Sequence, residues 1–416
     1  MLFFYDTALG LYGLLLRLLA PFVPKAAAWV AGRRGLLAHI ARTIGADPAP
    51  RVWFHCASLG EFEQGRPLLE AHRKAHPGTK LVLTFFSPSG YEIRKTWPGA
   101  DYIFYLPLDT RRNARAFLDV VRPRLVVFVK YEFWYHFLTE THRRRIPAVV
   151  VSAIFRADQV FFKHWGGFFR RILTRFAHIF TQNDASAELL RNAGLTQVSV
   201  AGDTRFDTVV ATAAAAGRSL PVVEAFVADG APVLVVGSSW PEDLPTLAPL
   251  LQRYQHQIRV LVAPHEITEN NLRLVEAVLP GQVQRYSQAQ PATVAQARVL
   301  LFDNVGLLSQ LYRFGHYAYI GGAFGKGLHN TLEAAAFGLP LFFGPVYAKF
   351  QEAVELVELK CAFSVHNAAE LEAAFTFLMH DEAARLRLQD TVLDYVHGQA
   401  GATRTIMAAL PGLSVS

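Results

Sequence analysis

The chain has 416 residues, of which 52% are apolar and only 18% are charged, with a formal net charge of +7 and a pI near 9.4. This composition excludes a disordered chain, and the length suits two α/β domains of about 200 residues each. The positive charge favours acidic partners, but nucleic acid is disfavoured because no RNA-binding signature or dense Lys/Arg tract occurs. The only cysteines, Cys56 and Cys361, are far apart, which argues against a disulfide framework and indicates a reducing compartment.

The first segment, residues 2–23, is long enough to span a bilayer and is apolar except at Asp6, Thr7 and Arg17. Charges inside a bilayer are costly, and the segment lacks the basic start and cleavage site of a signal peptide. Three cations placed to meet anionic head groups follow it: Lys25, Arg33 and Arg34. We therefore expect a helix that lies in the membrane interface or dips into it. The alternative is a buried first helix packed on its own domain.

A first series of short apolar runs reads as β-strands, with helical patterns such as 61–76 and 113–121 between them. The expected strands are 52–55, 81–86, 102–106, 125–129, 148–152, 179–181 and 198–201. Continuous apolar strands separated by helices are typical of a parallel sheet that is covered on both faces.

A second series of strands follows an Ala-rich linker. These strands are expected at 232–236, 259–262, 299–302, 317–320, 341–343 and 362–365. The predicted organisation is a membrane-associated segment with a basic flank (1–35), a first Rossmann-like domain (36–212), a linker (213–228) and a second Rossmann-like domain (229–416). A last helix, 382–397, is expected to pack back across the junction. In such sheets ligands bind beyond the carboxyl ends of the strands, so the chemistry is expected there, at a cleft between the domains.

The first strand ends in HCASLGEF, and a helix is expected to begin near Glu61. Ser58 and Gly60 allow a tight turn, which brings the Glu61 carboxylate to the mouth of the cleft as a candidate general base. The alternative role is charge complementarity at a helix N-terminus. That position is expected to favour the ionised carboxylate.

Two further strand ends of the first domain carry charged residues. Lys130 and Glu132 stand among aromatic residues after a buried strand, where charges are costly without partners. They either bind an acidic sugar or order the loop by pairing with each other. Arg205, in GDTRFD, either faces a phosphate or belongs to a hinge that Asp–Arg pairs hold.

The second domain has the strongest local signal, IGGAFGKGLHNTLEAAAFGLP, in which a strand enters a glycine-rich loop before a helix that begins near 329–331. Backbone N–H groups at that helix start are expected to bind an anion, and Glu333 is placed to bind the hydroxyls of a ribose. The spacing matches neither a dinucleotide fingerprint nor a P-loop. No Asp-x-Asp triplet occurs, which favours a nucleotide donor bound without metal. Candidate donor-site residues are Ser238, His265, Gly321, Gly322, Lys326, Gly327, His329, Asn330 and Glu333.

Together these loops resemble the Kdo transferases of lipopolysaccharide synthesis, from the N-terminal apolar segment to about residue 365. The best segments are CASLGEFEQGRPLLE, KYEFWYHFL, GDTRFD, GSSWPEDLP and GGAFGKGLHNTLEAAAFGLPLFFGP. The resemblance implies a GT-B fold, inverting transfer without metal or cofactor, and attachment to the cytoplasmic face of the inner membrane. The implied reaction moves 3-deoxy-D-manno-octulosonic acid (Kdo) from CMP-Kdo to a hydroxyl of the tetraacyl lipid A precursor, lipid IVA, and releases CMP.

The resemblance also implies roles for individual residues. Glu61 is the implied general base, and Ser58, Gly60 and Glu132 align with positions that shape the acceptor and sugar site. Gly322, Asn330 and Glu333 align with positions that hold the cytidine nucleotide.

Two departures concern the donor contacts. Lys130 replaces the first acid of a Glu-Thr-Glu-Leu-Trp-Pro motif, and Ala263-Pro264-His265 replaces Pro-Arg-His. Lys326 and Arg205 are the candidates for the missing positive charge.

Three other functions fit parts of the pattern: a GT-B lipid glycosyltransferase that uses a UDP-sugar, a nucleotide-sugar epimerase of related fold, and a non-catalytic lipid-binding protein. The epimerase has no use for an apolar first helix. The lipid-binding protein leaves the strand-end acids and the glycine-rich loop unexplained.

Overall fold

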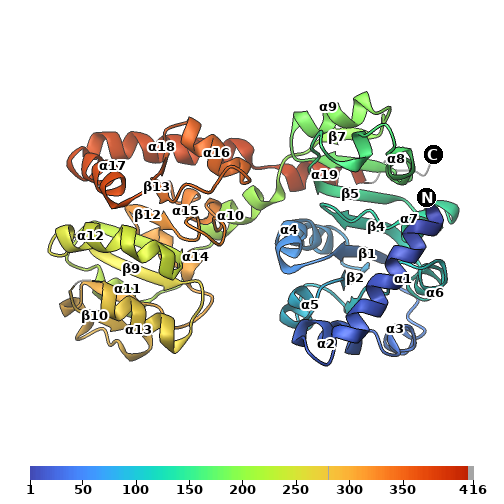
Figure 1. Ribbon diagram of the computed structural model, residues 1–416, viewed down its shortest axis with the longest axis horizontal. Coiled ribbons are helices and arrows are strands. Elements are labelled where there is room, and N and C mark those ends of the chain that lie inside the picture. Colours follow the sequence, from blue (N-terminus) through green and yellow to red (C-terminus); the bar gives the residue numbers. More distant parts are fainter. Residues whose placement is uncertain (280, 411–416) are drawn as a thin grey trace. The chain divides into compact units, whose positions relative to one another are not determined.

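The computed structural model describes residues 1–279 and 281–410. Contacts divide the chain into two compact units, each built around a parallel sheet. Unit 1 comprises Met1–Thr208 together with the chain from Gln399 onward, and unit 2 comprises Val209–Gly398. Two Rossmann-like doubly wound domains of the GT-B class are thereby confirmed (Figure 1).

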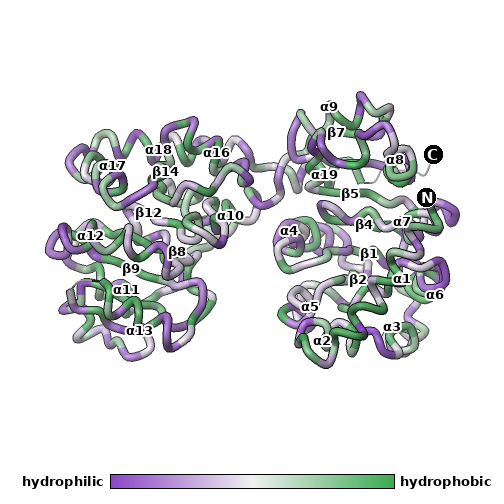
Figure 2. The backbone as a smooth tube through the Cα atoms, in the orientation of Figure 1, coloured by the Kyte–Doolittle hydropathy of each residue, from purple (hydrophilic) through white to green (hydrophobic). Residues whose placement is uncertain are grey.

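The sheet of unit 1 has seven parallel strands in the order β3-β2-β1-β4-β5-β6-β7. The strands are β1 Arg51–Cys56, β2 Lys80–Phe85, β3 Tyr102–Tyr105, β4 Pro123–Val129, β5 Ala148–Ala153, β6 His178–Thr181 and β7 Val198–Val200. All seven strands predicted for this domain are present within a few residues of their expected ends. They form because each is a short apolar run, and Figure 2 shows the middle of the sheet in the green of hydrophobic residues.

Helices cover both faces of this sheet. They are α1 Leu2–Leu19, α2 Pro24–Ala31, α3 Leu36–Ile44, α4 Leu59–Ala75, α5 Pro88–Arg94, α6 Arg111–Val121, α7 Tyr135–Arg143, α8 Gly167–Leu173, α9 Asp184–Asn192 and α19 Ala402–Ala409, with a 3-10 turn, η1 Val160–Phe162. Successive strand residues point to opposite faces, so Trp53 packs with α3, α6 and α7, whereas Phe54 packs with α4 and α19. Unit 1 therefore has one hydrophobic core on each face of its sheet, and alternate residues of β1 belong to the two cores.

The sheet of unit 2 also has seven parallel strands, in the order β10-β11-β9-β8-β12-β13-β14. Its strands are β8 Val233–Ser239, β9 Arg259–Pro264, β10 Val283–Arg285, β11 Val299–Leu301, β12 Tyr317–Ile320, β13 Leu341–Phe343 and β14 Ala362–Ser364. Strand β10 was not predicted, because this edge strand is short and mostly polar and none of its residues is fully buried.

The helices of unit 2 are short except near its end. They are α10 Thr204–Ala214, which begins in unit 1, α11 Pro221–Phe226, α12 Leu244–Tyr254, α13 Glu269–Val278, α14 Leu308–Leu311, α15 Leu332–Ala335, α16 Gln351–Glu358, α17 Ala368–His380 and α18 Glu382–Gln399, with 3-10 turns η2 Pro241–Asp243, η3 Tyr286–Gln288, η4 Val294–Gln296 and η5 Tyr312–Phe314. The expected linker, 213–228, thus contains the end of α10 and all of α11.

The first helix, α1, lies along unit 1 (Figure 1). Its N-terminal end is held by polar contacts: the Tyr5 hydroxyl donates to Asp109 Oδ2 at 2.5 Å, and Asp6 Oδ1 lies 2.6 Å from His136 Nε2. Further along, Gly13 is buried against Leu108. By length and composition α1 is able to cross a membrane, yet only 6% of it is buried in the protein. It is therefore neither a core helix nor detached from the domain.

The outer face of α1 is strongly apolar. Its exposed hydrophobic residues, with those of the following turn, are Leu2, Phe3, Phe4, Leu11, Tyr12, Leu14, Leu15, Leu18, Leu19, Phe22 and Val23. Among the three cations expected to meet head groups, Lys25 and Arg34 are exposed. Arg33 is not on that surface, because its guanidinium inserts between backbone carbonyls and aromatic rings of unit 1.

The end of the chain returns to unit 1. Both oxygens of Asp207 accept backbone hydrogen bonds at the start of α19, from Gly401 N at 2.6 Å and from Thr403 N at 2.7 Å. Ile406 then enters the same core as Phe62 of α4. The chain thus enters unit 2 through α10 and leaves it through α18.

Candidate active site

Glu61 lies in the first turn of α4, directly beyond the carboxyl end of β1, as predicted. Ser58 is the N-cap, and its hydroxyl accepts a hydrogen bond from Glu61 N. The Glu61 carboxylate in turn accepts one from Ala57 N. These reciprocal bonds fix the carboxylate at the edge of the sheet. Gly60 contributes less than expected: it is exposed, and a Cβ there meets nothing within 4 Å.

Glu132 follows β4, which pairs with β1, so the two carboxylates reach the same sheet edge. Glu132 is buried and is held from two sides: Trp134 Nε1 donates to its Oε2 at 2.6 Å, and His55 Nε2 lies 2.8 Å from the same oxygen. Behind His55, its Nδ1 lies 2.8 Å from the hydroxyl of Thr84. This network is satisfied when Thr84 donates to His55 and His55 donates to Glu132.

The setting of Glu61 raises its pKa. Burial raises the pKa of Glu61, and the nearby negative charge of Glu132 raises it further, to about 8, against the lowering effect of the Ala57 amide and Lys130. The expectation that the helix terminus keeps Glu61 ionised was therefore wrong in direction. Desolvation and a like charge outweigh the amide donors, and a carboxylate with a pKa near 8 is a stronger base than an exposed one.

Lys130 lies close enough to Glu61 to favour its ionised form. Its backbone is in the left-handed region, with a φ of 68°, which is uncommon outside glycine and typical of functional loops. Its Nζ also lies 5.4 Å from the centre of the Tyr131 ring. The cation that departs from the family motif thus lies beside the acidic cluster formed by Glu61 and Glu132.

His55, Thr84 and Trp134 support the acidic cluster, although they were not predicted as site residues. The available signal was a buried histidine and threonine in otherwise apolar strands.

Arg205 is held by its near neighbour in the chain, Asp203. Its Nε donates to Asp203 Oδ2 at 2.8 Å, and its backbone N donates to Asp203 Oδ1. This pairing agrees with the local hinge role that the sequence left open for GDTRFD.

In unit 2, three rings gather beyond β8, β9 and β12. Trp240 and His265 stack with centroids 4.7 Å apart, and His265 and His329 stack at 4.2 Å. Trp240 Nε1 donates to His329 Nε2 at 2.8 Å, and Lys326 Nζ lies 5.6 Å from the Trp240 ring centre. Burial, with a smaller effect from His265, lowers the pKa of His329 to about 4. Near neutral pH His329 is therefore uncharged, and with Nε2 accepting from Trp240 its Nδ1 carries the proton.

The glycine-rich loop is organised by a buried acid. One oxygen of Asp243 accepts hydrogen bonds from Gly322 N and Trp240 N, and the other accepts one from the Tyr319 hydroxyl. A Cβ on Gly321 would lie 2.4 Å from Ser238 O, so this glycine allows the two loops to touch. Asp243 was not predicted as a site residue; the available signal was an acid in the first turn after a strand, where its carboxylate accepts from Trp240 N.

Several backbone N–H groups of the glycine-rich loop form hydrogen bonds within the loop itself. Gly325 N and Gly327 N both donate to Gly322 O, and His329 N donates to Gly321 O. The helix that follows, α15, has a single turn. The amides expected to bind an anion are thus partly engaged within the loop, which leaves Lys326, His329 and Asn330 as its polar side chains.

Two more predicted donor residues lie beside the loop. Asn330 Nδ2 donates to Glu333 Oε1 at 3.0 Å, so these two form one polar pair. Ser238 has a φ of 52°, a left-handed conformation that lets β8 turn toward the glycine-rich loop. Within the described residues, no group of three or more His, Cys, Asp or Glu is arranged to hold a metal ion.

Solved structures share the fold. A UDP-N-acetylglucosamine 2-epimerase from Neisseria meningitidis, bound to UDP-GlcNAc, superposes with a TM-score of 0.63 at 14% sequence identity, over 87% of this chain and 100% of that one. A putative enzyme of the same name from Listeria monocytogenes gives 0.60 at 13% identity, over 87% and 96%. At these identities the likeness shows the two-domain architecture alone.

Sequence comparisons show similarity to one group of transferases. Residues 30–208 match the family described as 3-deoxy-D-manno-octulosonic-acid transferase (kdotransferase). Proteins named 3-deoxy-D-manno-octulosonic acid transferase are similar over most of the chain: 28% identical in Bordetella pertussis (96% of this chain, 98% of the relative), 26% in Chlamydophila psittaci (82% and 80%) and 25% in Aquifex aeolicus (79% and 86%). The resemblance seen in the motifs is thus confirmed, and the chain carries the Kdo transferase family domain and is related to these transferases over most of its length.

Proposed function

We propose that this protein is an inverting Kdo transferase, which moves Kdo from CMP-Kdo to a hydroxyl of the tetraacyl lipid A precursor (lipid IVA) and releases CMP. The observation that carries the proposal is Glu61, a carboxylate fixed beyond the end of β1 whose pKa is raised to about 8. The similarity of the chain to Kdo transferases supports Kdo transfer as the reaction in which this base takes part.

In the proposed reaction the ionised Glu61 removes the proton from a glucosamine hydroxyl of the acceptor. The acceptor oxygen attacks the anomeric carbon of Kdo from the face opposite CMP. A bond forms between that oxygen and the anomeric carbon as the bond from this carbon to the phosphate oxygen breaks. The electron pair leaves with CMP, and the configuration inverts.

The remaining residues of the acidic cluster have supporting roles. Glu132, held by Trp134 and His55, keeps the pKa of Glu61 high and so strengthens the base. Lys130 is a cation close to Glu61 and is suited to the carboxylate of Kdo, which is an acidic sugar.

The donor nucleotide is assigned to unit 2. Trp240 and His265 offer stacked ring surface, and Lys326 brings a positive charge next to them. His329 has an Nδ1 proton for a phosphate oxygen, and Glu333 is suited to ribose hydroxyls. Lys326 rather than Arg205 is the proposed replacement for the missing arginine, because Arg205 is already paired with Asp203. Preorganised donors of this kind stabilise the charge that develops on the leaving phosphate.

We place the protein on the cytoplasmic face of the inner membrane, with α1 in the membrane interface. Its apolar outer face supports this placement, and the polar contacts of Tyr5 and Asp6 with unit 1 favour a helix that lies on the bilayer surface over one that crosses it.

The test combines purified protein, CMP-Kdo and lipid IVA, with the product identified by its mass. Addition of Kdo to the acceptor, with one CMP released for each Kdo added, is the expected result, and the mass of the product gives the number of transfers. A Glu61→Gln variant is expected to bind CMP-Kdo within about 2-fold of the parent by calorimetry while turnover falls by about 10²–10⁴. Transfer from a UDP-sugar in place of CMP-Kdo, or near-normal turnover of the variant, would overturn the donor or the base assignment respectively.

A further inference from the structure

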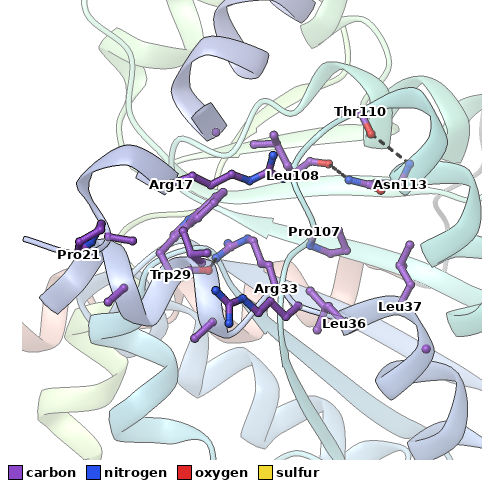
Figure 3. A pocket seen from close by; sticks show the side chains of 18 residues that line it. Arg17, Pro21, Trp29, Arg33, Leu36, Leu37, Pro107, Leu108, Thr110 and Asn113 are labelled. Atoms are coloured by element: carbon purple, nitrogen blue, oxygen red, sulfur yellow. Dashed lines mark hydrogen bonds between the residues drawn. The ribbon is translucent and has the colours of Figure 1, made fainter. Parts of the chain in front are cut away.

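A large pocket lies beside α1, away from the acidic cluster. It has a volume of about 1070 Å³, is open to solvent on one side, and is lined by α1, α2, α3 and the segment 107–113 of unit 1. None of the residues of the acidic cluster lines it. Figure 3 shows Arg17, Trp29 and Arg33 on one side of the pocket and Leu36, Leu37 and Pro107 on the other.

The pocket is positively charged. Three arginines line it, Arg17, Arg33 and Arg34, and no Asp or Glu does. None of the three forms an ion pair with any residue that the structure describes. Positive charges that share one concave surface without an acidic counter-ion favour an anionic ligand.

Arg33 shows that the charge is built into the fold. Its guanidinium donates to the carbonyl oxygens of Leu106, Trp29 and Phe86, at 3.0, 3.2 and 2.8 Å, and its Cζ lies 4.0 Å from the centre of the Trp29 ring. Carbonyls and rings orient the cation but do not neutralise it. The indole Nε1 of Trp29 is buried and has no hydrogen-bond partner, so the wall also holds an unused donor.

The surroundings of the pocket are apolar. Pro21 lines it, and the next residue, Phe22, is 81% exposed. The outer face of α1, with Leu14 and Leu18 among its exposed side chains, adjoins the same turn. A ligand with a charged end in the pocket and hydrocarbon beside α1 matches both surfaces.

We infer that this pocket binds the phosphate-bearing head group of an anionic bilayer phospholipid, with the acyl chains along the outer face of α1. The lipid is a bound ligand that orients the protein on the membrane and is not the acceptor. It does not reach the reacting atoms, because the pocket wall separates them: Arg33 lies over the Phe86 ring, and Phe86 packs against Trp134, which holds Glu132. This inference stands without the proposed transfer reaction.

The test uses the full chain labelled with 5-fluorotryptophan, in which the Trp29 resonance is assigned with a Trp29→Phe variant. Dihexanoyl phosphatidylglycerol, added below its micelle concentration, is expected to shift this resonance in a saturable way. Dihexanoyl phosphatidylcholine is expected to bind at least 10-fold more weakly, and inorganic phosphate at the same concentrations is expected to cause no shift. Equal binding of the two lipids, or saturation by phosphate alone, overturns the inference.

Variants separate the pocket from the general charge of the surface. The double variant Arg17→Gln/Arg34→Gln keeps Arg33 and is expected to weaken binding by about 10- to 30-fold. The matched control, Arg42→Gln, removes an exposed cation of α3 that does not line the pocket and is expected to change binding by less than 2-fold. Ala38→Trp, which fills the pocket without changing its charge, is expected to abolish the shift. An equal effect of Arg42→Gln, full binding by Ala38→Trp, or displacement of phosphatidylglycerol by the lipid A precursor refutes the assignment.

Discussion

The pairing of Glu61 with Glu132 leads to a prediction about the pH dependence of transfer. The pKa of Glu61 is raised to about 8, first by burial and second by the negative charge of Glu132. The general base must be ionised, so kcat/KM should rise with pH, with a midpoint at about 8. Replacing Glu132 by Gln removes the second cause while keeping the size of the side chain.

Burial is the larger cause of the raised pKa and the charge of Glu132 is the second. We therefore assign about 1 pH unit to the like charge, and the midpoint of the Glu132→Gln profile should fall by that amount. The ionised fraction of a base with its pKa near 8 is about 3% at pH 6.5, and a decrease of one unit makes it about 24%. The variant should therefore retain relatively more of its own maximal rate at pH 6.5, even if loss of the contacts with His55 and Trp134 lowers that maximum.

The assay measures kcat/KM for Kdo transfer from pH 5.5 to 9.5, and the midpoint is compared rather than the rate. Glu63→Gln is the matched control, because Glu63 lies on the same helix but is paired with Arg94 and Arg66. Its midpoint should stay with that of the parent. An unchanged or higher midpoint for Glu132→Gln would refute the coupling of the two carboxylates. A parent midpoint near 4.5 would refute the buried base itself.

Three further predictions concern stability. Since the fold raises the Glu61 pKa, stability from this group is complete below about pH 4.5 and is lost as the pH rises to about 8, so Glu61→Gln should unfold at higher urea than the parent at pH 9, by about 1–2 kcal/mol, but not at pH 4. Gly321→Ala should destabilise by about 1–3 kcal/mol in urea, because its Cβ would lie 2.4 Å from a backbone oxygen, whereas Gly325→Ala, with open space around it, should stay within about 0.5 kcal/mol; equal effects would refute the close contact of the loops. Tyr5→Phe should cost about 1–3 kcal/mol and speed hydrogen exchange in α1, because it removes a donor from the buried Asp109 carboxylate; unchanged exchange would mean that α1 is held by other contacts.

The fold was largely readable from the sequence because its strands are apolar runs that match the burial of a parallel sheet. Strand β10 was not predicted because its residues, Val283–Arg285, are only half-buried and two of the three are polar. The end of a helix was harder to predict than its start: the run after Asn330 is helix-compatible, yet α15 closes after Ala335.

Site residues within one local motif could be predicted from the sequence. Contacts between segments that are distant in the chain could not. Ser58 and Glu61 lie within one turn, so their geometry follows from helix capping. The high pKa of Glu61 depends on Glu132, which arrives from another strand, and on burial that no local pattern reports. His55 is anchored by Thr84 for the same reason: strand pairing, rather than sequence proximity, brings them together.

The two hydrogen bonds from the start of α19 to Asp207 have a consequence for synthesis of the chain. Unit 1 begins first but is completed last, because Ile406 belongs to the same core as Phe62. During translation all of unit 2 emerges from the ribosome before that core can close. Residues 1–208 made alone would leave the surface that α19 covers on α4 open to water. Unit 1 is thus assembled from segments that lie on both sides of unit 2 in the chain, and removing α19 takes Ile406 out of its core.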